Sequence, residues 1–93
     1  MKKYTINEKH YELIENYKDG FDLTEVQNKL TEFFDNYDYI VGDWAYGKLR
    51  LKGFCEKTNK NHNNVNSYKN KDVYIKEECA YDCKNFILQK IKG

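Results

Sequence analysis

The chain has 93 residues, of which 40% are hydrophobic and 33% charged, with no proline and a formal net charge of +1. This length fits one domain over residues 1–93, because domains usually contain about 100–150 residues. No apolar run is long enough to span a bilayer, and the first residues do not lead into the apolar stretch of a signal peptide, so we expect a cytoplasmic protein.

A β-hairpin and a helix are the first elements predicted along the chain. Apolar and polar side chains alternate over residues 4–17 around a polar centre, which is typical of two paired strands. Asp19-Gly20 then marks a turn. Asp22 is placed to cap a helix, and apolar residues follow it at helical spacing, so we expect a helix over about 22–36.

Residues 38–55 are predicted to form a second hairpin, connected through Ala45-Tyr46-Gly47. Gly42 and Gly53 lie inside its strands, where a glycine indicates a bulge or the close approach of another backbone segment. The second strand alternates. One side of this strand carries Leu49, Leu51 and Cys55. The other side carries Lys48, Arg50, Lys52 and Phe54.

The last third of the chain begins with a polar stretch. Residues 57–71 are rich in asparagine and lysine and contain no acidic residue, which predicts a flexible loop too polar to pack. A helix capped by Asn70 or Asp72 is expected to run to about Cys83, and residues 86–91 are apolar enough for a central strand. The order β-β-α-β-β-α-β predicts an α+β fold, with both helices on one face of a mostly antiparallel five-stranded sheet.

The near-neutral total charge conceals an uneven distribution along the chain. Residues 1–46 have a net charge of −5, whereas residues 47–93 have a net charge of +6. Such a chain can attract a charged partner or a second copy of itself, although the neutral total argues against strong nonspecific binding to nucleic acid.

The run from Tyr39 to Phe54 (YIVGDWAYGKLRLKGF) resembles the signature of the YutD-like family, small and largely uncharacterised proteins of Bacillus-type bacteria. The segments 11–15, 74–79 and 86–88, together with Cys83, match the same pattern. Family members usually carry a glycine before the second cysteine of the Cys-x-x-x-Cys pair, where this chain has Asp82. The resemblance implies a cytoplasmic, one-domain α+β protein, and it implies no particular reaction.

The second hairpin carries the strongest candidate for a binding surface. Basic side chains beside aromatic ones on a strand suit phosphates and stacked bases, although the solvated face of an antiparallel strand has the same pattern. Asp43 and Trp44 lie next to the hairpin turn, where binding residues are often found, although Asp43 is also placed to pair with Arg50 or Lys48. The candidate partner-binding residues are Asp43, Trp44, Tyr46, Lys48, Arg50, Lys52 and Phe54.

The cysteines give the alternative hypothesis of a thiol or zinc site. Cys79 and Cys83 are four residues apart, which places both sulfur atoms on one side of a helix. Cys55 with His62 or His10 is the set available to complete a tetrahedral zinc site, whereas packing of small buried side chains explains the same cysteines without a metal.

No motif of a known enzyme mechanism is present: the chain has no phosphate-binding loop and no nucleophile beside a histidine base. We therefore expect a non-catalytic interaction or regulatory module without a cofactor. It is expected to be a monomer that binds a protein or an RNA-containing assembly through the second hairpin.

Overall fold

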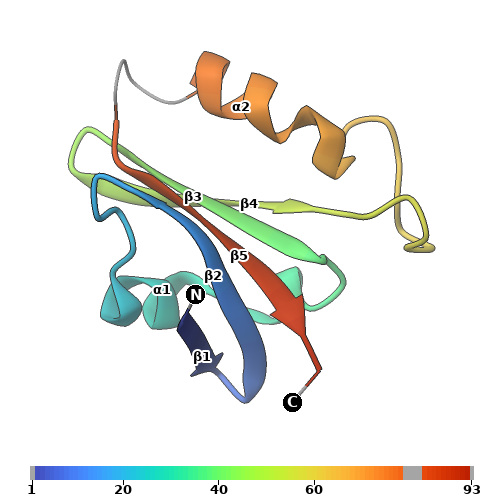
Figure 1. The fold of residues 1–93 in the computed structure, drawn as a ribbon, viewed down its shortest axis with the longest axis horizontal. Coiled ribbons are helices and arrows are strands. Elements are labelled where there is room, and N and C mark those ends of the chain that lie inside the picture. Colours follow the sequence, from blue (N-terminus) through green and yellow to red (C-terminus); the bar gives the residue numbers. More distant parts are fainter. Residues whose placement is uncertain (1, 79–82, 93) are drawn as a thin grey trace.

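A five-stranded antiparallel sheet forms the centre of the computed structural model, which describes residues 2–78 and 83–92. The strand order is β1-β2-β5-β3-β4, so the apolar last strand lies at the centre, as the sequence predicts. In Figure 1 the red β5 passes between β2 and β3. The strands are β1 (Lys2–Ile6), β2 (Lys9–Tyr17), β3 (Tyr39–Ala45), β4 (Lys48–Phe54) and β5 (Asn85–Ile91); the helices are α1 (Leu23–Lys29) and α2 (Lys71–Glu78), with 3-10 turns η1 (Glu32–Phe34) and η2 (Tyr68–Asn70).

The two helices cover opposite faces of the sheet (Figure 1). Ile40 and Val41 are adjacent on β3 and both fully buried, yet they belong to different core clusters. Ile40 packs in the cluster that contains Val26 of α1, whereas Val41 packs in the cluster that Tyr74 of α2 covers. The prediction that both helices share one face is therefore wrong, because apolar side chains on both faces of β3 each require a cover.

The α+β class and the element order are confirmed, as are both predicted hairpins. Asn7-Glu8 and Tyr46-Gly47 form their two-residue turns, with φ angles of 51° and 72° and of 54° and 75°. Positive φ at both positions is what a type I′ hairpin turn requires. In β2, Ile14 packs on the α2 side, opposite Leu13, so this strand contributes apolar side chains to both faces of the sheet. A bulge between Leu13 and Glu15 then shifts the register with β5, so that Glu15 pairs with Ile87.

The first helix is shorter than the sequence predicts. It begins after Asp22, whose side chain accepts a hydrogen bond from the main-chain N–H of Glu25 at 3.2 Å, as expected of its cap. It ends before Leu30, which is extended, and η1 follows. The Asn7 side chain donates a 2.6 Å hydrogen bond to the Leu30 carbonyl, so a contact from the first hairpin helps to terminate a helix that local periodicity alone would continue.

The second helix is described over Lys71–Glu78 only. Its expected continuation to Cys83 crosses residues 79–82, which lie outside the described part of the chain. Neither helix, as far as the structure describes them, is long and apolar enough to cross a membrane.

Gly42 and Gly53 each face an aromatic ring. A Cβ atom on Gly42 would lie 2.1 Å from the ring of Phe86, and one on Gly53 would lie 2.3 Å from the ring of Tyr37. The prediction of a bulge or of a nearby backbone segment is therefore wrong at both positions, because side-chain rings fill the space beside these glycines.

The asparagine-rich stretch folds back against the end of β4. Cys55 and Ser67 form an isolated parallel bridge, and the ring of Tyr68 stacks on that of Tyr39 with 3.6 Å between centroids. Ser67 and Asn66 are buried. The expectation that this stretch is too polar to pack is therefore wrong, because asparagine amides satisfy the main-chain groups of the loop. Its mobility in solution stays a prediction.

Candidate functional site

The tip of the β3–β4 hairpin projects beyond the body of the sheet. Ala45 and Lys48 are the last paired residues, and Tyr46-Gly47 connects them. The Tyr46 side chain is fully exposed, and Lys48 beside it is also exposed. The tip therefore presents an aromatic ring and a cation directly to solvent.

Asp43 and Arg50 form an ion pair across this hairpin, as the sequence allowed. Arg50 donates from Nε and Nη2 to Oδ2 of Asp43, at 3.1 and 2.5 Å. The Asp43 side chain is fully buried, whereas 41% of the Arg50 side chain is exposed. The Tyr74 hydroxyl donates to Oδ1 of Asp43 at 3.3 Å. The buried Asp43 carboxylate thus fixes the orientation of the Arg50 side chain, and through Tyr74 it connects α2 to the sheet.

Trp44 is both a structural anchor and part of the surface. Its indole N–H donates to the Gly20 carbonyl at 2.7 Å, which fixes the turn after β2 against the hairpin. The ammonium group of Lys84 lies 4.7 Å from the centroid of the indole ring, a cation–π distance. Lys84 therefore adds a positive charge to the same end of the sheet.

Phe54 and Lys52 belong to the contact with α2 rather than to the hairpin tip. Phe54 is buried, and its ring meets that of Tyr74 edge to face with 5.8 Å between centroids. Lys52 is half-buried, with its ammonium group 5.9 Å from the Phe54 ring centroid. Phe54 was predicted to be a partner-binding residue on the exposed side of the strand. This prediction is wrong, because α2 covers this end of β4. The residues left at the hairpin end are Trp44, Tyr46, Lys48 and Arg50, and Lys84 joins them; we call this set the hairpin-end surface. Trp44 lies on the α1 face of the sheet and Arg50 on the α2 face, so the surface extends around the end of the hairpin.

Lys84 is the member of this surface that the sequence did not predict. It lies 40 residues from Trp44 in the chain, and the two meet because β5 pairs with β3 from Asp43 to Tyr39, starting at Asn85. Only the strand order could have revealed this proximity, since no local pattern around Lys84 differs from that of an ordinary loop lysine.

The cysteines are not assembled into a site within the described residues. Cys55 is a free, fully buried thiol whose pKa is raised by burial and by the charge of Asp38. Cys83 is disulfide-bonded. Cys79 and Asp82 lie outside the described residues, and over 2–78 and 83–92 no three His, Cys, Asp or Glu side chains are placed to hold a metal ion. The zinc hypothesis, with Cys55 and His62 or His10 as further ligands, gains no support from this part of the chain.

Together, the sheet and its two helices define a small α+β domain that exposes an aromatic ring and several cations at one end. The chain belongs to the YutD-like family: a family model described as "Putative antitoxin YutD-like" matches residues 5–89. The resemblance inferred from the sequence is thereby confirmed.

Similarity to a bacterial relative and to a solved structure extends over nearly the whole chain. It is 39% identical over 87 residues to "Putative antitoxin YutD" of Bacillus subtilis (strain 168), which covers 94% of this chain and 96% of that protein. The solution NMR structure of protein yutD from B. subtilis superposes with a TM-score of 0.81 at 37% sequence identity, covering 99% of this chain and 84% of that one.

Proposed function

We propose that this protein is a non-catalytic binding module that docks an acidic surface of a partner protein on the hairpin-end surface. The observation that carries the proposal is the fully exposed side chain of Tyr46 at a turn position with φ of 54°. A left-handed conformation costs a non-glycine residue about 1 kcal/mol or more, and Asn-Gly is the sequence that favours this turn. A bulky ring held there without an intramolecular core contact suits a binding role.

The chemistry around Tyr46 supports a protein partner with acidic groups. Tyrosine, tryptophan and arginine are the residues most enriched at the energetic centres of protein interfaces. Arg50 is held in place by Asp43 before any partner arrives, which reduces the entropy lost on binding. Lys48 and Lys84 add positive charge, which accelerates association with an acidic surface.

The relatives supply independent support for a protein partner. They are named putative antitoxins, and a toxin protein is the partner that such a name suggests. A role in binding agrees with that name and needs no catalytic residue or cofactor; we propose in addition that the protein acts as a monomer in the cytoplasm.

The experiment compares affinity capture by three forms of the full chain from native cytoplasm. These forms are the wild type, the double variant Tyr46→Ala/Lys48→Glu, and the control Val65→Ala/Lys60→Glu. The control also truncates an exposed apolar side chain and reverses one lysine charge, but in the 57–71 loop. We expect one protein to be enriched with the wild type and the control, and to be lost at least tenfold with the hairpin variant.

Nuclease treatment separates protein from RNA as the partner. Capture that survives nuclease supports the proposal. Capture that disappears with nuclease, and RNA affinity that falls steeply with salt, would instead indicate an RNA partner. Equal capture by the hairpin variant and the control would show that the hairpin-end surface is not the binding site.

A further inference from the structure

A second, chemically different site lies at the opposite end of β2. A cavity of about 510 Å³ separates the β1–β2 turn from the connection between α1 and η1. Its floor is apolar and buried, formed by Ile6, Leu30 and the ring of Tyr11. Its rim is polar and largely exposed, so the cavity is open to a group that enters from solvent.

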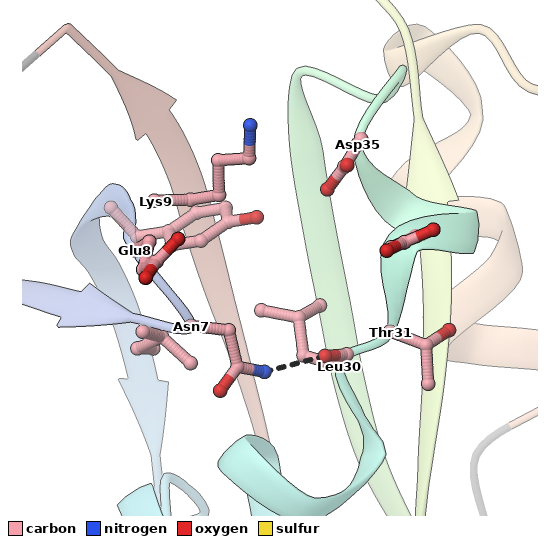
Figure 2. Close-up of a pocket in the computed structure, with 9 residues that line it drawn as sticks. Asn7, Glu8, Lys9, Leu30, Thr31 and Asp35 are labelled. Atoms are coloured by element: carbon pink, nitrogen blue, oxygen red, sulfur yellow. Dashed lines mark hydrogen bonds between the residues drawn. The ribbon is translucent and has the colours of Figure 1, made fainter.

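The two walls of this pocket are joined by hydrogen bonds. Asn7 donates from its side-chain amide to the carbonyl of Leu30 at 2.6 Å and to that of Gln27 at 3.3 Å. Figure 2 shows the hydrogen bond from Asn7 to Leu30 crossing the pocket, with Glu8 on the hairpin side and Asp35 on the helix side. The pocket is therefore a built feature of the fold, because the same contact ends α1 and fixes its distance from the hairpin.

Carboxylates dominate the rim. Glu8, Glu32 and Asp35 line the pocket, and Lys9 is the cation among the lining residues. Lys90 approaches from β5 and donates to the main-chain carbonyl of Asp35. These groups leave an excess of negative charge at the mouth of an apolar cavity.

The Tyr11 hydroxyl has no hydrogen-bond partner among the described residues. Tyr11 lines the pocket and is only 1% exposed, yet its hydroxyl makes no hydrogen bond to any residue within 2–78 or 83–92. Burial, with the charge of Asp35, raises its pKa, so it is a neutral hydroxyl at physiological pH. The ring of Tyr11 is buried, whereas the hydroxyl oxygen is not among the fully buried atoms that lack a partner, so a donor that enters the cavity from solvent can reach it.

We propose that this pocket binds the cationic end of a lysine or arginine side chain of a protein partner. Such a side chain has an apolar stem, which suits the floor of Ile6 and Leu30, and an N–H-rich head, which suits the Tyr11 hydroxyl and the rim carboxylates. The surplus of negative charge on the rim complements a basic partner segment. The proposal does not rest on the hairpin-end surface, which lies at the other end of the sheet.

The test is an NMR titration of the full chain with a capped arginine (Nα-acetyl-arginine methylamide) and with capped citrulline, its neutral isostere. We expect saturable shifts of the amide signals of Asn7, Glu8, Thr31 and Glu32 with capped arginine, in the millimolar range typical of a single small group. Capped citrulline should bind at least tenfold more weakly. Absence of saturable shifts, or equal binding of citrulline, would overturn the proposal.

Three variants assign the effect to named groups. Tyr11→Phe should leave the melting temperature nearly unchanged, because the hydroxyl has no hydrogen bond to lose within the described part of the chain, but should weaken binding at least threefold. Glu32→Gln with Asp35→Asn should weaken it at least tenfold, whereas the matched control Glu77→Gln, exposed on α2, should have no effect. Unchanged binding by both pocket variants would show that capped arginine binds elsewhere.

One further arm distinguishes a protein side chain from a free amine. Agmatine carries the same guanidinium group on a butyl chain that ends in a free amine instead of a peptide unit. An affinity of agmatine within threefold of that of capped arginine supports a side chain as the occupant. Agmatine binding more than tenfold tighter would overturn that assignment in favour of a small amine. Tyr46→Ala should bind capped arginine like the wild type, so failure of the hairpin proposal and failure of this one are separable.

Discussion

Arg50 holds the fully buried carboxylate of Asp43 from the neighbouring strand, at 3.1 Å through Nε and 2.5 Å through Nη2. The two residues are direct partners in the β3–β4 register, so the pair is formed by the hairpin itself. The guanidinium covers a charge that would otherwise be buried without a cation, and it remains partly exposed for a partner. The structure and the proposed binding therefore both depend on the Arg50 side chain.

Arg50→Ala is expected to lower the free energy of unfolding by about 2–3 kcal/mol, somewhat less than for a fully buried pair because Arg50 is partly exposed. The loss arises mainly from the carboxylate left buried without its cation. The apolar double variant Asp43→Val/Arg50→Leu should be more stable than Arg50→Ala alone, since it removes both charges. Urea unfolding measures the free energy of unfolding of both variants, and Lys48→Ala is the exposed control on the same strand. A double variant that is no more stable than Arg50→Ala would contradict this account.

Gly42→Ala is expected to cost at least about 3 kcal/mol, because the new methyl group would overlap the fully buried ring of Phe86. Gly53→Ala should cost less, since Tyr37 is only half-buried and its ring can move toward solvent. Thermal unfolding of both variants provides the comparison. The smaller Phe86→Leu side chain should restore part of the stability lost in Gly42→Ala; equal costs at the two glycines would show that neither ring limits the space.

Local sequence patterns were sufficient to predict the hairpins and the central strand. The hairpins follow from alternation around short polar turns, and β5 follows from an apolar run with no polar face. The Asp43–Arg50 pair was also accessible, because its two residues face each other across a two-residue turn. These features depend on neighbours that are close in the chain.

Features that depend on distant contacts were missed. Residues 22–36 have the periodicity of one helix, but the Asn7 amide binds the Leu30 carbonyl where the helix ends. Phe54 alternates like a surface residue, but α2 covers it. The pocket around Tyr11 had no sequence signal at all, because its two walls come together only when the first hairpin packs against α1.

Tyr46→Asn is expected to raise the free energy of unfolding by about 0.5–1 kcal/mol, since Asn-Gly is favoured in a type I′ turn and the fully exposed ring contributes no core contact. Chemical denaturation measures the gain, and the capture experiment measures the accompanying loss of partner. A variant that is more stable but binds less would mean that the tyrosine is kept at a cost in stability. A destabilised variant would instead give Tyr46 a structural role.

Stability is expected to fall at alkaline pH. Burial raises the pKa values of Tyr11, Tyr39 and Tyr68 above the ordinary value of 10.0, and for Tyr39 the hydrogen bond to Glu56 at 2.5 Å adds to the effect. Above pH 10 the unfolded chain releases protons that the folded chain retains, so unfolding becomes more favourable as the pH rises. Each retained proton contributes a slope of about 1.4 kcal/mol per pH unit, whereas below about pH 9 these tyrosines contribute none.

Urea unfolding between pH 7 and pH 11 tests this expectation. Tyr39→Phe removes one of the retained protons and should reduce the alkaline slope by up to about 1.4 kcal/mol per pH unit. Tyr46→Phe is the matched control, because it removes a hydroxyl from a fully exposed ring. Because Tyr39 stacks on Tyr68, the same measurement reports on the asparagine-rich loop: an unchanged slope in Tyr39→Phe would mean that the loop does not keep Tyr39 buried in solution.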